Sequence, residues 1–325
     1  MAAPAEVGPA LPTLAEIRAA AARIAGIARR TPLERCGWLS ERAGADVFLK
    51  LECWQPTRSF KVRGAANAIL GLGPASASRG VVTASAGNHG QAVALVAARA
   101  GIPAVVHVPA TAPAVKKQRI RALGALLEDS APDYDAAEAL AARHAEHTGA
   151  TLVHAFSDPA VVCGQATVGL EILAELPDCG SVVVPVGGGG LIAGIGAVLR
   201  AAGSTARLIG AQSERTRNMY EAFAAGTVVD CAIEPTLADG LAGCTDQPAY
   251  LRARAVTDAL HLVSEAAIGA ALRAHLARDG LLLEGSGAVA TAALLERIEA
   301  PGPTVLVLTG GNIDPATLAT VLRTE

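Results

Sequence analysis

Lys61 is the residue of this chain best placed to do covalent chemistry. It lies two residues after Ser59, a candidate N-cap, and therefore just inside a predicted helix start. The positive end of a helix dipole disfavours an ammonium group, which lowers the pKa of a lysine at that position. A lysine that is partly neutral can form a Schiff base with a carbonyl compound. Most lysines at helix starts are simply solvated, so the other segments of the chain decide whether this chemistry is present.

A run of four consecutive glycines predicts an anion-binding loop. An apolar segment at 182–186, typical of a buried strand, precedes the run, and a helical stretch at 192–200 follows it. Residues without side chains let backbone N–H groups close around an anion, and a helix start adds positive potential. The expected guest is a phosphate, and the alternative is a tight turn, for which four glycines are more than needed. The loop comprises Gly187, Gly188, Gly189, Gly190 and Leu191.

The same loop admits a second interpretation, a nicotinamide-dependent oxidoreductase. Gly188, Gly190 and Ala193 match the spacing of a loose dinucleotide fingerprint, and Glu214 follows near a second predicted strand. Such a match is weak on its own, and it leaves the segment around Lys61 unexplained.

Two other predicted strands end in polar residues that suit ligand binding. One runs into Ser85, Asn88 and His89, where backbone amides can hold a carboxylate and the Asn88 amide can bond a ring hydroxyl or phenolate. The other, at 305–308, ends in Thr309 and two glycines. The alternatives are ordinary capping roles for His89 and Thr309. Ser85 is not expected to be a hydrolytic nucleophile, because no Gly-x-Ser-x-Gly pattern surrounds it.

The composition excludes several classes of protein. The formal net charge is -3 over 325 residues, so no basic surplus is available for a nucleic acid or an anionic membrane surface. Apolar residues make up 51% of the chain, yet no apolar run is long enough to span a bilayer, and no secretory signal is evident. The 6 cysteines include no CxxC pair, which fits neither a zinc site nor a disulfide scaffold. We therefore expect reduced thiols and a cytoplasmic location.

Apolar runs that alternate with helical patterns predict an α/β chain with buried parallel sheets. Helices are expected at 91–100, 134–147, 161–176 and 265–278. Strands are expected at 47–51, 80–84, 104–108, 150–155, 182–186, 208–211, 260–263 and 305–308. The stretch 71–76, rich in Gly and Ser, is a candidate linker between two α/β units. Ligands of such folds gather at the carboxyl ends of the strands.

Together these segments resemble the fold type II family of pyridoxal-phosphate enzymes, and in particular its serine/threonine dehydratases and serine racemases. The resemblance runs from Thr31 to Asn312. It implies two parallel-sheet domains with the cofactor between them: a large cofactor-binding domain, 1–74 plus 158–325, and a small mobile domain, 75–157. It also implies a homodimer.

The same resemblance implies a role for each motif residue. Lys61 carries pyridoxal 5'-phosphate as a Schiff base, and the four glycines with Leu191 cradle the phosphate. The residues expected around the cofactor ring are Phe60, Asn88, Glu284 and Thr309, the last of which bonds the pyridine nitrogen. The residues expected at the substrate carboxylate are Ser85, Ala86, Asn88 and His89.

The reaction implied is the elimination of water from a β-hydroxy amino acid, L-threonine or L-serine, to give a 2-oxo acid and ammonia. Lys61 would remove the α-proton. A neutral hydroxyl at Thr309 cannot keep the pyridine nitrogen protonated, which suits a reaction whose β-substituent leaves promptly. Alternative substrates are 3-hydroxyaspartate, phenylserine and a hydroxyectoine-pathway compound. A non-catalytic ligand-binding descendant is a further alternative, which an intact Lys61 disfavours.

Several positions depart from the family pattern. Serine racemases carry a hydroxyl residue where this chain has Ala86, so elimination is expected rather than racemisation. Members with a divalent-cation site use acidic ligands where this chain has Gln212 and Asn218. Amides are poor replacements for carboxylates on a hard cation, so no metal is expected. Glu214 and Glu221 lie nearby and leave a shifted site open.

Two loops and the C-terminus also differ from the family. Arg58 stands where glycine is usual in the lysine loop, and a guanidinium there could bind an anionic substrate side chain; the alternative is a solvent-facing arginine. Residues 284–287 read Glu-Gly-Ser-Gly in place of Glu-Pro-Ser-Gly, which predicts a more flexible loop. The chain ends about where the catalytic core ends, so we expect no C-terminal regulatory domain and no feedback inhibition by isoleucine.

Overall fold

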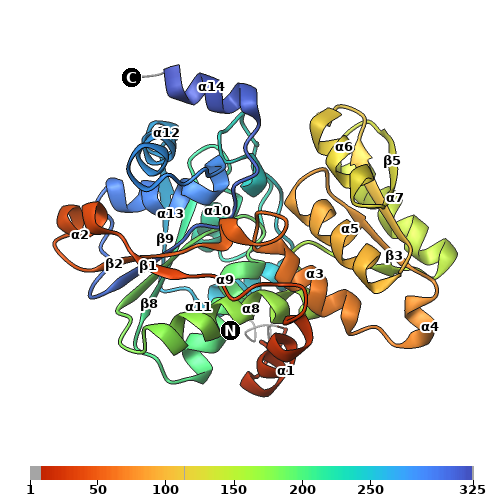
Figure 1. The fold of residues 1–325 in the computed structure, drawn as a ribbon, viewed down its shortest axis with the longest axis horizontal. Coiled ribbons are helices and arrows are strands. Elements are labelled where there is room, and N and C mark those ends of the chain that lie inside the picture. The colour runs from red at the N-terminus through yellow and green to blue at the C-terminus, as the bar shows by residue number, and fades with distance from the viewer. Residues whose placement is uncertain (1–8, 113, 324–325) are drawn as a thin grey trace, which may run out of the picture.

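A six-stranded sheet forms the larger part of the fold (Figure 1) in the computed structural model, which describes residues 9–112 and 114–323. The strand order is β1-β2-β10-β7-β8-β9. The bounds are β1 Leu33–Arg35, β2 Val47–Lys50, β10 Thr304–Val307, β7 Ser181–Pro185, β8 Arg207–Ser213 and β9 Ala259–Val263. The strands β2, β10, β7, β8 and β9 run parallel to one another, as expected.

The edge strand β1 adds an antiparallel pair to the otherwise parallel sheet, since it pairs with β2 with Leu33 opposite Lys50. The connection between the two strands holds only the short helix α2, Gly37–Ala43. It is shorter than the crossover that a parallel pair requires, so the chain returns antiparallel.

Helices cover both faces of the larger sheet, and the alternation along β7 shows this directly. Val183 packs into one apolar core together with α12 and α13, whereas Val182 and Val184 pack into a second core with α8, α9 and α11. The bounds are α8 Pro159–Glu175, α9 Gly190–Ala201, α10 Asn218–Ala225, α11 Gln247–Val256, α12 Glu265–Ala274 and α13 Gly285–Leu295.

A second sheet of four parallel strands, ordered β5-β4-β3-β6, lies beside the first (Figure 1). Its strands are β3 Val81–Ala84, β4 Ala104–Pro109, β5 Leu126–Ala131 and β6 Thr151–Leu152. The helices α5 Asn88–Ala100 and α6 Ala114–Ala122 pack on one face, and α7 Tyr134–Thr148 packs on the other. We call β3 to β6 with these three helices the small-sheet unit.

The remaining elements connect or flank the two sheets. They are α1 Leu14–Ile24, α3 Lys61–Leu70, α4 Pro74–Ala77, α14 Pro315–Arg323 and the 3-10 turns Glu52–Trp54 and Asp239–Leu241. Within the described ranges, no helix is long and apolar enough to cross a membrane.

All eight expected strands are present with shifted ends, but some elements differ from the expectation. The strand expected at 150–155 has only two residues, and β1 and β5 were not expected. The helix expected at 265–278 ends at Ala274 and continues as a π-helix, His275–Asp279. The expected linker is partly helical, since α4 begins at Pro74. The domain boundaries next to residues 75 and 157 stay a prediction.

A buried network of four charges joins β2, the first 3-10 turn, α3 and α8. Arg63 forms two bonds with the Glu52 carboxylate, at 2.7 and 2.8 Å, and its Nη1 lies 2.6 Å from Glu171 Oε1. Lys50 Nζ lies 2.6 Å from the other oxygen of Glu171. The two positive and two negative charges balance, which is the condition for burying them together. Because Arg63 lies in the first turn of α3, the network fixes the start of the helix that carries Lys61.

Replacing Arg63 by Met is expected to destabilise the fold by about 3–5 kcal/mol, because the Glu52 carboxylate, 0% exposed, then lacks its partner. The measurement is the free energy of unfolding in urea. Arg18→Met, which removes an exposed arginine of α1, is the control and should change the free energy by less than about 0.5 kcal/mol. Equal stability of the two variants would contradict the role given to the network.

Candidate functional site

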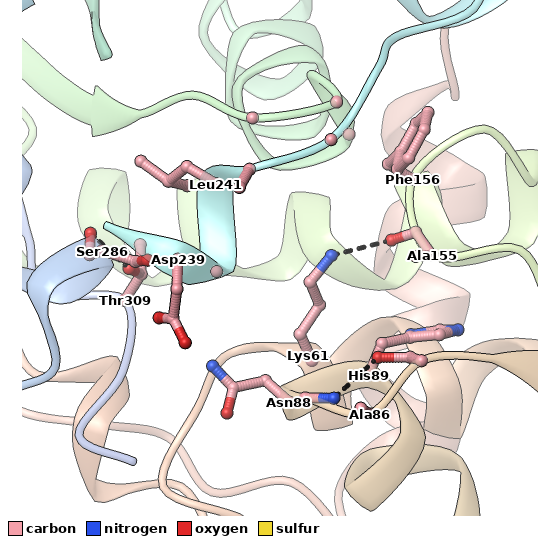
Figure 2. A pocket seen from close by; sticks show the side chains of 18 of the residues that line it. Lys61, Ala86, Asn88, His89, Ala155, Phe156, Asp239, Leu241, Ser286 and Thr309 are labelled. Carbon is pink, nitrogen blue, oxygen red and sulfur yellow. Dashed lines mark hydrogen bonds between the residues drawn. The ribbon is translucent and has the colours of Figure 1, made fainter. Parts of the chain in front are cut away.

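A cavity of about 300 Å³ opens beside the carboxyl ends of β3, β7 and β10, because residues that follow these strands line it (Figure 2). This is the edge at which ligands of parallel sheets are expected. The predicted site residues that line the cavity are Phe60, Lys61, Ser85, Ala86, Asn88, His89, Gly187, Gly188, Gly189, Gly190, Leu191, Glu284 and Thr309. Both sheets therefore contribute to one site.

Lys61 is the first residue of α3 and points into the cavity (Figure 2). Its Nζ donates to the carbonyl oxygen of Ala155 at 3.0 Å and lies 5.2 Å from the centre of the Phe60 ring. Burial lowers the pKa of Lys61 to about 8, since desolvation penalises the ammonium form. The N-cap residue is Phe60, not Ser59, although the Ser59 hydroxyl accepts from the Lys61 amide at 3.3 Å.

The glycine loop leads from β7 into α9, which begins at Gly190. Gly189 has φ +91°, a left-handed conformation that side chains disfavour. A Cβ at Gly188 would overlap the Phe156 ring, and one at Gly190 would lie 2.8 Å from the Phe156 carbonyl oxygen. The loop therefore requires glycine for steric reasons, and the first amides of α9 are left to bind an anion.

The segment after β3 enters α5 at Asn88, three residues earlier than expected. The Ser85 hydroxyl accepts from the Gly87 amide at 3.1 Å. His89 Nε2 lies 2.9 Å from the Val153 carbonyl oxygen, so this nitrogen carries the proton, and the buried Nδ1 has no partner within the described residues. Burial lowers the pKa of His89 to about 3, and the charge of Lys61 acts in the same direction. The imidazole is therefore neutral.

Glu284, the residue before α13, lines the cavity and bonds to Asn88. The Asn88 Nδ2 donates to Glu284 Oε1 at 2.6 Å. Burial raises the pKa of Glu284 to about 7, and the nearby Asp239 raises it further, while the Asn88 bond opposes both. Thr309 Oγ1 donates to the Ser286 carbonyl oxygen at 3.2 Å, so the hydroxyl must rotate before it can donate to an unprotonated ring nitrogen.

Of the two interpretations of Arg58, the structure favours the solvent-facing arginine over a residue that binds the substrate. Arg58 is not among the residues that line the cavity. Its guanidinium donates instead to the carbonyl oxygens of Leu282 and Gly311, each at 3.2 Å. Its φ of +54° lies in the left-handed region, which explains why a glycine suits this position.

Several residues that line the cavity were not predicted. Asp239 Oδ2 lies 2.6 Å from Lys116 Nζ, an ion pair that joins α6 of the small-sheet unit to the turn Asp239–Leu241. Phe156 and Ser286 also line the cavity. Ser286 lies two residues after Glu284, and this closeness to a predicted site residue could have identified Ser286 as a residue of the cavity. Asp239 lies in an irregular stretch with no periodic signal.

The amides at the family's cation positions are bonded to each other. Gln212 Nε2 donates to Asn218 Oδ1 at 2.7 Å, and Asn218 Nδ2 donates to the Gly243 carbonyl oxygen at 2.6 Å. Among residues 9–112 and 114–323, no group of three or more His, Cys, Asp or Glu side chains could hold a metal ion.

Three observations show that the cavity fits pyridoxal phosphate. A buried amine with a lowered pKa suits its aldehyde. A glycine loop at the start of α9, whose first amides have no partner within the helix, suits its phosphate. The buried Ser286 hydroxyl has no partner within the part of the chain described, and a polar ring can supply one.

Comparison with known proteins agrees with this fit. Residues 24–310 match the family described as "Pyridoxal-phosphate dependent enzyme". The L-threonine ammonia-lyase of Thermotoga maritima is 41% identical over 93% of this chain and 76% of its own length. The structure of maize serine racemase superposes with a TM-score of 0.91 at 32% identity, covering 96% of this chain and 97% of its own. The processed threonine deaminase isoform 2 from Solanum lycopersicum gives 0.87 at 32% identity, covering 98% and 93%.

Gly188→Ala is expected to weaken pyridoxal phosphate binding about five- to a hundredfold, because overpacking against Phe156 costs about 1–3 kcal/mol and displaces the loop. Fluorescence titration of the cofactor-free protein measures the effect. The double variant Gly188→Ala/Phe156→Leu should recover part of the loss. Gly37→Ala, where a Cβ meets open space, is the control. Wild-type affinity in Gly188→Ala would overturn the steric argument.

The rate at which the cofactor-free protein forms a Schiff base with pyridoxal phosphate should depend on the pKa of Lys61. Only the neutral amine reacts, so the rate should rise about tenfold per pH unit below pH 8 and level off above it. Stopped-flow absorbance between about pH 6 and 10 measures the profile. An ordinary lysine would show a rate that still rises at about pH 10, and such a profile would contradict the role of burial.

Proposed function

The chain belongs to the pyridoxal-phosphate-dependent enzyme family, and we propose that it is an ammonia-lyase that dehydrates L-threonine or L-serine. The observation that carries this proposal is the buried Lys61 amine, with a pKa of about 8, in a cavity shared with the glycine loop. The 41% identity to an L-threonine ammonia-lyase supports the substrate class. The family match overturns the nicotinamide-dependent alternative, which explained only the glycines.

The residues around the cavity suit the two ligands differently. Gly187 to Gly190, with Leu191, would hold the cofactor phosphate, and Phe60, Asn88, Glu284 and Thr309 would surround its ring. Ser85, Ala86, Asn88 and His89 would bind the substrate carboxylate through the amides at the start of α5. When bound, the cofactor supplies an electron sink that makes the α-proton of an amino acid acidic.

Lys61 is the base that the site offers for this α-proton. Its lowered pKa leaves a large neutral fraction near pH 8, and burial keeps water from competing for the amine. Loss of the α-proton and of the β-hydroxyl removes one water from the substrate. Hydrolysis of the resulting enamine adds one water and releases a 2-oxo acid and ammonia. His89 cannot replace Lys61 as this base, because a pKa of about 3 makes its imidazole a much weaker base.

Ala86 favours elimination over racemisation. Racemisation needs a second group that returns a proton to the opposite face of the α-carbon, and the methyl group of Ala86 carries no proton to give. The residue lines the cavity close to Asn88, the position at which such a group would act.

Other β-hydroxy amino acids remain candidate substrates. The position of Arg58 removes the argument for 3-hydroxyaspartate that rested on that residue. Phenylserine differs from threonine only beyond the β-carbon, where small changes in a pocket decide preference, and a hydroxyectoine-pathway compound is a further candidate.

We also propose that the protein is a homodimer in the cytoplasm. The family resemblance supports the dimer. All six cysteines are free, and four of them are buried, which agrees with a reducing compartment.

Release of 2-oxo acid by the pyridoxal-phosphate-loaded protein tests the function. L-threonine or L-serine should be turned over faster than threo-3-hydroxyaspartate or phenylserine, with and without a chelator. Lys61→Ala should lower turnover about 10²–10⁴-fold. Lys117→Ala, which removes a lysine outside the cavity, is the control and should leave turnover unchanged. Full turnover by Lys61→Ala would refute the mechanism, and preference for an anionic or aromatic substrate would refute the substrate class.

A further inference from the structure

Asn312 lines the cavity, and its side-chain nitrogen donates to two oxygen atoms. Its Nδ2 donates to the main-chain carbonyl oxygen of Thr57 at 2.8 Å and to Asn88 Oδ1 at 2.7 Å. Asn88 in turn donates from Nδ2 to Glu284 Oε1 at 2.6 Å. A continuous chain of side-chain amides therefore runs from Thr57 in the lysine loop to Glu284 at the cavity wall.

The Thr57 carbonyl sets the direction of every bond in this chain. A carbonyl oxygen only accepts, so the atom of Asn312 that faces it must be the amide nitrogen. The second proton of that nitrogen goes to Asn88, so the atom of Asn88 that faces Asn312 must be the oxygen. The Asn88 nitrogen is thereby turned toward Glu284, whose carboxylate can accept it.

One N–H of Asn88 remains after these bonds are counted. The Asn88 amide carries two protons, and Glu284 takes one of them. Asn88 lines the cavity, so the second N–H is available to an oxygen of a ligand bound there. A flipped amide would instead present a carbonyl oxygen, which repels the ionised ring oxygen of pyridoxal phosphate.

We propose that Asn312 is a positioning residue, which fixes the Asn88 amide with its nitrogen toward Glu284 and the bound cofactor. The inference rests on the proposed function in that Asn88 meets the cofactor ring. Asn312 itself lines the cavity, and in this proposal its side chain acts through the bond that it donates to Asn88.

The proposal predicts that Asn312→Asp weakens cofactor binding more than Asn312→Ala does. A residue that only filled space would give the reverse order. Asn312→Asp keeps the size of the side chain but replaces both donated protons by an acceptor, so Asn88 turns its nitrogen toward the introduced carboxylate and its oxygen toward Glu284 and the cavity. Asn312→Ala removes the bonds without reversing them, and Asn88 can still adopt the wild-type orientation. If Asn312 only filled space, the isosteric Asp would be the milder change.

Equilibrium binding of pyridoxal phosphate to the cofactor-free protein tests this order. We expect the dissociation constant to rise severalfold in Asn312→Ala and by tenfold or more in Asn312→Asp, about the effect of losing one hydrogen bond to a charged group. The absorption maximum of the bound cofactor should shift in Asn312→Asp and stay near the wild-type value in Asn312→Ala. Weaker binding by Asn312→Ala than by Asn312→Asp would overturn the proposal.

Asn67→Asp is a matched control for the cost of a buried carboxylate. Asn67 is 4% exposed, its Nδ2 donates to the Ala160 carbonyl oxygen at 2.7 Å, and its Oδ1 accepts from Arg23. It does not line the cavity. This variant should lower the unfolding temperature without shifting the absorption maximum of the bound cofactor. An equal spectral shift in both Asp variants would overturn the proposal.

A double-mutant cycle gives a second test that does not depend on the folding of Asn312→Asp. If Asn312 acts through Asn88, then Asn312→Ala should weaken cofactor binding in the wild-type background and have no further effect in Asn88→Ala. Equal losses in both backgrounds would overturn the proposal. A different result would refute the proposed function: the wild-type protein would show no cofactor absorbance that borohydride removes. The role of Asn312 toward the cofactor would then be refuted as well.

Discussion

The buried network of Lys50, Glu52, Arg63 and Glu171 is the constraint on which the position of the reactive amine depends. Four charges can be buried only if each keeps its partners, and their partners lie on β2, the adjoining 3-10 turn, α3 and α8. A rotation or shift of α3 would break several of these bonds at once. Since Lys61 begins this helix, the network holds the amine where burial lowers its pKa.

The cavity combines this fixed lysine with a wall that is set by steric contact rather than by charge. Phe156 packs against the glycine loop so closely that Cβ atoms at Gly188 and Gly190 have no room. Phe156 comes from the segment after β6, and Lys61 bonds to the neighbouring residue, Ala155. The same short segment therefore positions the amine and shapes the anion-binding loop, which explains why both lie in one cavity.

Local sequence features predicted those parts of the site that a single short segment supplies. The glycine run, the lysine at a helix start and the polar strand ends all line the cavity. Features that depend on contacts between distant segments could not be predicted in this way. Arg58 turns away because carbonyl oxygens of distant loops accept its guanidinium, and β5 was missed because its run Leu-Leu-Glu-Asp-Ser-Ala is half polar. The bonds of Asn312 join residues more than two hundred positions apart, and no local pattern reveals them.

The glycine loop also limits how such a site can diversify. A binding surface made of main-chain amides is independent of side-chain identity, and the tight contacts around Gly188 and Gly190 exclude any added side chain. Substitutions in the glycine loop can therefore weaken anion binding but cannot change which ligand the loop selects. New substrate preferences must arise from residues whose side chains line the cavity, such as Ala86, Lys116 and Asp239. Anchoring of an anion and choice of a substrate thus depend on two kinds of group in one pocket, main-chain amides for the first and side chains for the second.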